Sequence, residues 1–444
     1  MNEDTIAAIA TAPGEGAISI IRISGKDAFL IAGRVFSGNV NSYASHTAHL
    51  GKIFSKEGSV IDEVLLLVMH EGRSYTGEAS VEIMCHGGSF ITQKVLARIL
   101  EAGARAAGPG EFSLRAFKNN RIDLAQAEAV QELIAAKNEL ALKAASDQLQ
   151  GRLSILVADL QKCITDITAI IEAWVDYPEE GLEFASESDL IEMLNTTKEK
   201  MVRLANTFHD GALLNVGKSI CLLGSPNVGK SSLMNALLDE ERAIVTPIAG
   251  TTRDILHEEL RIHGIPFQLF DTAGIRETEE VIEMEGISRS KKTAKNSDLV
   301  LILLDITKKL SIDEEALLLN YPNALILWNK SDLPHTPPER SGIKISAKYK
   351  TGLDELKQEI LKKITSNPLL DKEQLTLTKE RHFAALNKAI DSIDLVILGF
   401  KNKISPEFLA FDLRQSLKAL GEILGTNVTE DILGAIFAKF CVGK

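Results

Sequence analysis

Apolar residues follow three different patterns along this chain, and the first occupies residues 1–118. Short apolar runs there are separated by glycine and polar positions, as in Ile6–Ala10, Ala17–Ile23, Val64–Met69 and Val81–Met84. Runs of this length between turn residues predict strands, and Thr92–Glu101 has the spacing of a helix. The first pattern therefore predicts an α+β domain.

The second pattern is helical and occurs twice. Between Asp123 and Asp176 the only glycine is Gly151 and there is no proline, while apolar residues recur at helical spacing. Pro178 ends this run, and a further helix is expected over Ser188–Phe208. Helical spacing returns after Leu369: Ser405 and Pro406 are expected to open a helix that runs to Ile423, and Thr429 to cap a last one that ends at Phe440.

The third pattern lies between the two helical segments. From Ser219 to about Ile364, apolar strands alternate with helices, which predicts a doubly wound parallel sheet. The two helical segments are expected to form one discontinuous domain, because insertion is tolerated where chain ends lie close together. The predicted boundaries are 1–118, 119–214, 215–366 and 367–444.

Composition places the chain among ordinary globular proteins. It has 444 residues, 45% hydrophobic and 25% charged, and its apolar runs are too short to span a bilayer. The acidic start and the scattered cysteines lead us to expect a cytoplasmic protein without an export signal. A net charge of −12 argues against broad nucleic-acid binding. RNA would need a local basic patch such as Arg289–Lys292 with Lys295, although a solvated helix face is the better explanation of that patch.

The most informative motif begins the third segment. Residues 224–231 read Gly-Ser-Pro-Asn-Val-Gly-Lys-Ser, in which backbone N–H groups close around phosphates, Lys230 reaches the outer phosphates and Ser231 ligates Mg²⁺. Asp271-Thr272-Ala273-Gly274, Asn329-Lys330-Ser331-Asp332 and Ser346-Ala347-Lys348 follow in order, each at the end of an apolar strand. The aspartate of the second of these suits the two donors on a guanine edge. Together the four elements predict guanine nucleotide binding.

The residues that would drive hydrolysis are less clearly marked. Ile275 stands where a Ras-like enzyme has the glutamine that orients water, so any glutamate from Glu277 to Glu285 is eligible for that role. Asn227 suits either a monovalent cation near the phosphates or a simple turn after Pro226. The loop 246–254 is expected to be the first switch, with a threonine on Mg²⁺. Cys221 is expected to be a buried thiol.

Beyond these elements the chain resembles the bacterial tRNA modification GTPases of the MnmE (TrmE) family over its full length. The residues that carry the resemblance are Ile21-Arg22-Ile23-Ser24-Gly25, Thr76-Gly77-Glu78, His86-Gly87-Gly88, Pro109-Gly110-Glu111-Phe112, Leu124-Ala125-Gln126-Ala127-Glu128-Ala129, Gly250-Thr251-Thr252-Arg253-Asp254 and Phe440-Cys441-Val442-Gly443-Lys444.

The resemblance implies an N-terminal folate-binding and dimerisation domain, a discontinuous helical domain and an inserted Ras-like G domain. It implies K⁺-stimulated GTP hydrolysis when two G domains meet, with Glu283 orienting water. Mg²⁺ would be held by Ser231 and Thr252, and K⁺ by Asn227, Thr246, Ile248 and Thr251. The expected GTP-binding residues are Asn227, Val228, Gly229, Lys230, Ser231, Ser232, Thr246, Thr251, Thr252, Asp271, Thr272, Ala273, Gly274, Asn329, Lys330, Asp332, Ser346, Ala347 and Lys348.

The resemblance also implies a partner and a second site. A flavoprotein of the MnmG (GidA) family would bring FAD and use NADH, and the pair would attach an aminomethyl or carboxymethylaminomethyl group to carbon 5 of the wobble uridine of tRNAs. The one-carbon unit would come from a 5-formyl- or methylene-tetrahydrofolate. Folate-binding residues would be Arg22, Glu82, Arg121 and Lys444, where Arg121 replaces an expected lysine, and Cys441 would act in the modification.

A structural ion pair between Arg22 and Glu82 is the alternative explanation of those two residues from the sequence alone. The alternative function is an Era-like ribosome-assembly switch that binds RNA without modifying it. Such a protein is expected to carry an RNA-binding module after the G domain, such as a KH fold with its Gly-x-x-Gly loop, and residues 365–444 instead have helical spacing.

Overall fold

The computed structural model describes residues 4–177, 185–241, 257–262, 265–271, 294–295, 297–338, 340–364 and 375–443. For residues 214–216, 240–241, 257–259 and 271 it describes the backbone only. The chain divides into two compact units. Unit 1 contains residues 1–131, 148–194 and 391–444, and unit 2 contains residues 132–147 and 195–390.

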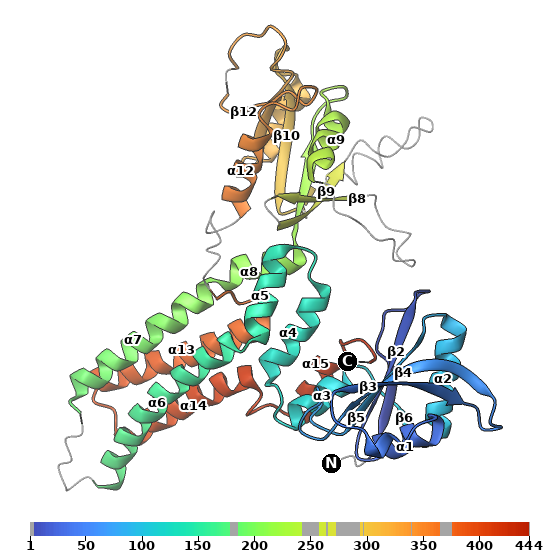
Figure 1. Cartoon of the computed structure of the whole chain (residues 1–444). Coiled ribbons are helices and arrows are strands. Elements are labelled where there is room, and N and C mark those ends of the chain that lie inside the picture. Colours follow the sequence, from blue (N-terminus) through green and yellow to red (C-terminus); the bar gives the residue numbers. More distant parts are fainter. Residues whose placement is uncertain are drawn as a thin grey trace. The chain divides into compact units, whose positions relative to one another are not determined.

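The first layer of unit 1 is a mixed sheet in the order β3-β4-β5-β2-β1-β6 (Figure 1). Its strands are β1 (Ile6–Ile9), β2 (Ile18–Ser24), β3 (Thr47–Phe54), β4 (Val60–Met69), β5 (Ser80–His86) and β6 (Arg105–Ala106). Helices α1 (Ala28–Val35) and α2 (Ser89–Glu101) cover one face, where alternate strand residues such as Ile21, Ile23 and Ile83 are fully buried. The four predicted strands and the predicted helix are confirmed.

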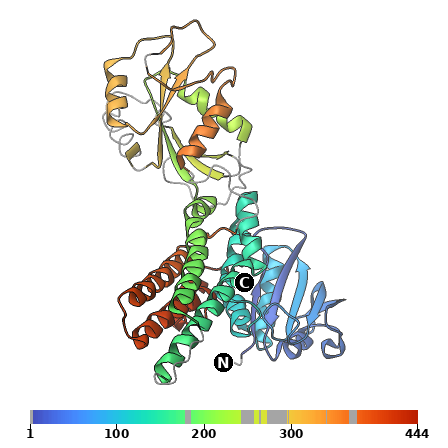
Figure 2. The same ribbon diagram turned by 90° about the vertical axis from the view of Figure 1, so that its left-hand side faces the viewer.

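Unit 1 also brings together helices from both helical segments of the sequence. Figure 2 shows α14 (Pro406–Leu424) beside α6 (Arg152–Asp176), and Arg414 on α14 donates a 2.8 Å hydrogen bond to Glu172 on α6. Helix α15 (Glu430–Phe437) packs its apolar face on α3 (Glu111–Lys118) and the start of α4 (Leu124–Ala135). Segments more than 230 residues apart in the chain therefore share one core, which supports the predicted discontinuous helical domain.

The remaining helices of the helical segments are α5 (Glu139–Leu149), α7 (Glu187–Asn206), α8 (Phe208–Val216) and α13 (Glu380–Lys401). The helix starts predicted at Ser405 and Thr429 are confirmed as N-cap positions, with Pro406 in the first turn. Neither cap side chain makes a capping hydrogen bond, and α15 ends at Phe437, three residues before the predicted end at Phe440. The final residues instead form the segment that reaches the N-terminal sheet.

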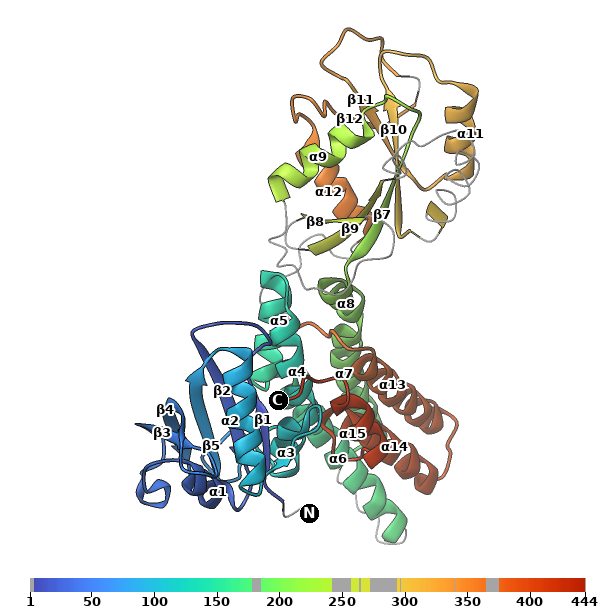
Figure 3. The ribbon, with the colours of Figure 1, turned by 90° about the vertical axis from the view of Figure 1, so that its right-hand side faces the viewer.

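Unit 2 contains the predicted doubly wound sheet, in the order β12-β11-β10-β7-β9-β8. Its strands are β7 (Lys218–Leu223), β8 (His257–Ile262), β9 (Ile265–Asp271), β10 (Leu299–Asp305), β11 (Leu325–Asn329) and β12 (Ile343–Lys344). All are parallel except β8. Figure 3 shows α9 (Lys230–Glu241) and α12 (Leu353–Ile364) on one side and α11 (Ile312–Asn320) on the other.

Strand β10 shows why the sheet needs helices on both faces. Each of its residues is buried, and Leu301 and Leu303 face the α9–α12 core while Ile302 and Leu304 face the α11 core. Cys221 lies in the second core with no exposed surface, so its predicted structural role is confirmed. The multidomain fold class, with an N-terminal α+β layer, helices and a doubly wound G domain, is confirmed.

Candidate functional site

The phosphate-binding loop lies at the carboxyl end of β7, where the chain enters α9. Gly224 and Gly229 have positive φ angles of 154° and 102°, and Asn227 adopts the left-handed region at φ 63°. A side chain on Gly224 would collide with the carbonyl oxygen of Leu303, and one on Gly229 with the amide of Asn329. Glycine at these two positions therefore lets the backbone of the loop pack against its neighbours. In the resulting tight curve, backbone N–H groups can bind phosphate oxygens.

Lys230 occupies the first position of α9 and is buried. Its ammonium group donates hydrogen bonds to the carbonyl oxygens of Gly224 at 2.7 Å and Ser225 at 3.0 Å. The charge is thus held inside the curve of the loop, where a nucleotide's phosphates would be attracted. Ser231 follows in the first helical turn, the position from which a hydroxyl reaches Mg²⁺ in P-loop proteins. Val228 lies two residues before Lys230, and Ser232 directly follows Ser231.

Asn329 connects the phosphate loop to the loop that would cover the base. Its side-chain nitrogen donates to the Val228 carbonyl oxygen at 2.8 Å, and its oxygen accepts from the Ala347 backbone N–H at 3.0 Å. Asp332 accepts a 2.6 Å hydrogen bond from the Ser346 hydroxyl, which orders its carboxylate beside the same loop. Lys348 follows Ala347 and is exposed. One buried amide therefore fixes the distance between the phosphate and base elements.

Lys330 and Asp305 form a further pair at this edge of the sheet. The Lys330 ammonium group lies 2.6 Å from one carboxylate oxygen of Asp305, whose side chain is only 4% exposed. The other oxygen accepts from the backbone N–H and hydroxyl of Thr307 at 3.0 Å and 2.6 Å. Burial alone would raise the pKa of Asp305, but these hydrogen bonds outweigh it and lower the pKa. Asp305 belongs to none of the motifs predicted from the sequence, although it ends an apolar strand as Asp271 does.

The backbone of Asp271 ends β9 opposite Leu222 of β7, at the same sheet edge as the phosphate loop. The other residues expected at the γ-phosphate and the cations lie outside the described residues. They are Thr246, Ile248, Thr251, Thr252, Thr272, Ala273, Gly274 and Glu283, together with most of the basic patch at 289–292 and 295.

A second cluster lies on the face of the N-terminal sheet opposite α1 and α2. Arg22 of β2 pairs across the strands with Glu82 of β5, and its Nε donates to a Glu82 carboxylate oxygen at 2.8 Å. The guanidinium lies 5.8 Å from the ring centre of Tyr75 and 5.6 Å from that of Phe112. The predicted ion pair is therefore present, and two aromatic rings hold it in place.

Tyr75 is anchored by a 2.8 Å hydrogen bond between its hydroxyl and that of Ser113. Burial raises the pKa of its phenol, so the group stays neutral beside Arg22. Neither Tyr75 nor Phe112 was predicted from the sequence to be a site residue. The available signal was their position, since Tyr75 precedes Thr76-Gly77-Glu78 and Phe112 ends Pro109-Gly110-Glu111-Phe112.

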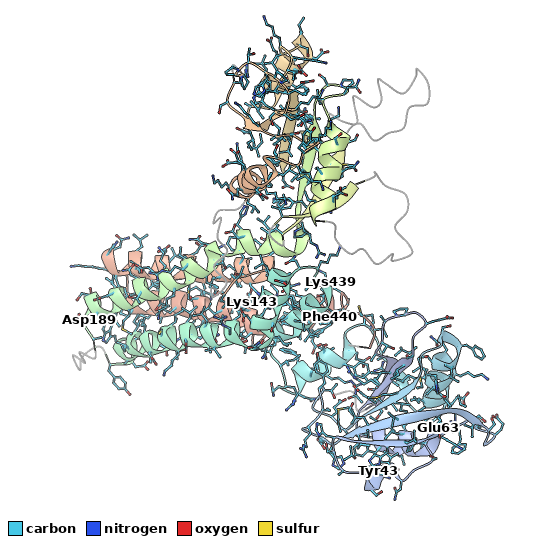
Figure 4. The ribbon with its side chains drawn as sticks, turned by 45° about the horizontal axis from the view of Figure 1, so that its top comes forward. Tyr43, Glu63, Lys143, Asp189, Lys439 and Phe440 are labelled. Atoms are coloured by element: carbon cyan, nitrogen blue, oxygen red, sulfur yellow. The ribbon has the colours of Figure 1, made fainter. Side chains whose placement is uncertain are left out.

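The segment after α15 reaches this cluster. Val442 forms an antiparallel bridge with Pro109, and the Gly110 N–H donates to the Cys441 carbonyl oxygen at 3.3 Å. The Gly443 carbonyl oxygen then accepts from the Arg22 guanidinium at 3.4 Å. Figure 4 places the labelled Phe440 next to Lys439, away from Tyr43 and Glu63, and Phe440 packs with Leu124 and Phe437 where this segment begins. The structure thus brings Arg22, Glu82 and exposed Cys441 into one region.

Arg121 contacts a neighbouring part of the same region. Its guanidinium donates a 3.2 Å hydrogen bond to the Gly72 carbonyl oxygen, in the loop that also contains Tyr75. Lys444, the fourth residue of the expected folate site, lies outside the described residues.

A phosphate loop at the carboxyl edge of a doubly wound sheet, joined by an Asn-Lys-x-Asp motif to a base-covering loop, defines a P-loop GTPase. Two family models match the chain: the TrmE N-terminus over residues 5–121 and the MnmE helical domain over residues 124–441. The chain belongs to the family of the tRNA modification GTPase MnmE.

Relatives of that name match the chain from end to end. The MnmE of Protochlamydia amoebophila is 54% identical over 99% of this chain and 98% of its own length. The MnmE of Chlamydia trachomatis serovar L2 is 44% identical over the full length of both chains. Among solved structures, Aquifex aeolicus Era is 27% identical over 40% of this chain and 67% of that one, with a TM-score of 0.27, too low to define the fold.

Proposed function

We propose that this chain is a K⁺-stimulated GTPase that, with a flavin-dependent partner of the MnmG family, installs aminomethyl or carboxymethylaminomethyl groups at carbon 5 of the wobble uridine of tRNAs. The observation that carries the proposal is that one chain holds both a guanine nucleotide site and the Arg22–Glu82 cluster with Cys441 beside it. Family membership at 54% identity over nearly the full length supports it.

In the nucleotide site, Lys230 would neutralise the outer phosphates, and Ser231 with Thr252 would ligate Mg²⁺. The described residues fit this use, because the backbone N–H groups at the start of α9 and the Lys230 ammonium group both lie at the phosphate-binding loop. Asn227, in its left-handed conformation, would supply one oxygen to K⁺, with Thr246, Ile248 and Thr251 as the remaining ligands. K⁺ would then contribute the positive charge that other GTPases take from an arginine. Glu283 would orient water.

The Arg22 cluster fits the carboxylate and amide groups of a tetrahydrofolate. The Arg22 guanidinium donates from Nε to Glu82 and from Nη1 to the Gly443 carbonyl oxygen. These two hydrogen bonds fix its orientation, and its other terminal nitrogen can donate to a bound anion. A 5-formyl- or methylene-tetrahydrofolate would supply the one-carbon unit when bound. Arg121 and Lys444 would add charge, and Cys441 would act from the tail on the tRNA base or the one-carbon unit.

A homodimer is expected to form through the exposed part of the N-terminal sheet face opposite α1 and α2, which also carries the Arg22 cluster. Leu50 of edge strand β3 pairs with Leu65 of β4 on that face, and these side chains are 70% and 42% exposed. Ile18 of β2 lies on the same face and is 59% exposed. Neighbouring exposed apolar residues on a sheet face favour a self-association surface. Among the described residues no helix is long and apolar enough to cross a membrane, and the expected location remains the cytoplasm.

The Era-like alternative is less well supported. Described residues after the G domain form α13, α14 and α15, and the model of the MnmE helical domain extends over them to residue 441. An RNA-binding module of the KH type would require strands there.

The test is GTP turnover by the purified chain in KCl and in NaCl at equal ionic strength, with Asn227→Ala in parallel. Potassium should stimulate turnover at least tenfold, and the substitution should remove that stimulation. Equal slow turnover in both salts would refute the cation mechanism. The modification itself is tested by mass spectrometry of tRNA nucleosides from cells whose own copy is replaced by Cys441→Ser, which should lack the modified uridine while GTP turnover persists.

A further inference from the structure

Strand β10 carries a lysine-paired aspartate at each end. At its carboxyl end, Asp305 pairs with Lys330 at 2.6 Å and is bonded to Thr307. Just before its amino end, Asp298 pairs with Lys218 at 2.6 Å and accepts from the Ser219 backbone and hydroxyl at 2.9 Å and 2.7 Å. The two carboxylates have similar partners but lie at opposite edges of one sheet.

The nucleotide elements that the structure describes lie at the carboxyl edge. Asp305 follows Leu303 by two residues, and the Leu303 carbonyl oxygen lies against Gly224 of the phosphate loop. The Asp305 partner Lys330 stands between Asn329 and Asp332 in the guanine-recognition motif. Register pairs Asp305 with Asn329 on adjacent parallel strands. Asp305 is therefore adjacent to both parts of the site without belonging to either motif.

Two features describe the conformation of Lys330. Its backbone adopts a left-handed conformation at φ 68°, which is unfavourable for a residue with a Cβ. Its long side chain also has several rotatable bonds, so an unpaired lysine would lose conformational entropy when a bound base orders it. Because the ammonium group is paired with a nearly buried carboxylate, the end of the side chain is fixed while 32% of the side chain remains exposed. A stem held in this way offers a flat apolar surface to a base.

We propose that Asp305 is a positioning residue for guanine nucleotide binding, which acts by holding the Lys330 stem against one face of the base. The nucleotide contact belongs to Lys330, and Asp305 sets its geometry while Thr307 orients Asp305. Losing this contact should affect how long the nucleotide stays bound more than how fast it arrives, because a misplaced stem weakens the formed complex.

The experiment measures release of fluorescently labelled GDP from the full chain after mixing with excess unlabelled GDP. Asp305→Asn should release GDP about tenfold faster, which corresponds to about 1.4 kcal/mol of binding free energy. Lys330→Met should have a similar effect. The double variant should release GDP no faster than Lys330→Met alone, because Asp305 acts through Lys330.

Asp298→Asn is the matched control, since it removes a lysine-paired carboxylate next to the same strand at the opposite edge. Its GDP release should equal that of the unsubstituted chain, even if its melting temperature falls as far as that of Asp305→Asn. The proposal is overturned if Asp305→Asn leaves the rate of GDP release unchanged, or if Asp298→Asn raises that rate as much. It is also overturned if the rate increases of the two single variants multiply in the double variant. Should Asp305→Asn not fold, Thr307→Val serves instead, and release within error of the unsubstituted chain would count against it.

Discussion

The two candidate sites are built in different ways. In the nucleotide site, short motifs follow neighbouring parallel strands, and one buried amide, Asn329, joins two of them through hydrogen bonds of 2.8 Å and 3.0 Å. In the N-terminal cluster, Arg22 meets a residue 421 positions away, Gly443, and its other neighbours Tyr75, Glu82 and Phe112 come from separate elements. The nucleotide site is built from loops that follow adjacent strands of one sheet. The N-terminal cluster also needs a segment from the far end of the chain to dock against it.

The largest expected effect tests the local site. Lys230→Ala removes the ammonium group inside the phosphate loop and should weaken GTP binding by about 100-fold or more, because charge-assisted contacts to phosphate are lost. Equilibrium titration with labelled GTP measures this. Lys218→Ala, at the amino end of the same strand that leads into the loop, is the control and should bind GTP normally. Comparable losses in both variants would mean that the Lys230 effect comes from destabilisation of the sheet.

A smaller loss is expected at the second site. Arg22→Ala should weaken binding of 5-formyltetrahydrofolate about tenfold or more, the effect of removing one charged hydrogen-bonding partner. Isothermal titration calorimetry gives the affinity. Arg34→Ala is a suitable control, because Arg34 lies on α1, which covers the other face of the sheet, and donates to the Ala102 carbonyl oxygen. If Arg34→Ala weakens binding as much, the Arg22 cluster is not the folate site.

Displacing the segment after α15 should weaken folate binding less than the loss of Arg22 does. Gly443 has φ 96°, and a Cβ there would collide with the Ile9 carbonyl oxygen. Gly443→Ala should displace the tail and weaken folate binding several-fold, while GTP binding stays unchanged. The control is Gly434→Ala in α15, where a Cβ would meet no atom within 4 Å. Should folate affinity be equal in the two variants, docking of the tail does not shape the site.

The smallest effect concerns acid stability. Burial would raise the pKa of Asp298, but hydrogen bonds from Lys218 and Ser219 outweigh it and lower the pKa. Its ionised form therefore adds stability above the unfolded pKa of about 3.9, and that contribution disappears as pH falls through the lower folded pKa. Urea unfolding between pH 5 and pH 3 should show a shallower loss of stability in Asp298→Asn than in the unsubstituted chain. Parallel curves would show that the carboxylate is not preferentially ionised in the folded state.

The sequence alone determined the alternation of strands and helices in the described part of the G domain. Each strand and each nucleotide motif is specified by residues close together in the sequence. The position of each motif directly after a parallel strand was therefore enough to place Lys230, Asn329 and Asp332 at one sheet edge. It also located the helical segments and most strands of the N-terminal layer. Resemblance to a family, and not spacing, selected Arg22 and Glu82.

Only the tertiary structure decided which distant residues meet. Pairing of β2 with β5 placed Arg22 opposite Glu82, and docking of the segment after α15 brought Gly443 to the same guanidinium. Asp305 likewise had no motif of its own, and its role became visible only because β10 lies beside β11. Such contacts depend on strand order and on packing between segments hundreds of residues apart, which local spacing does not encode.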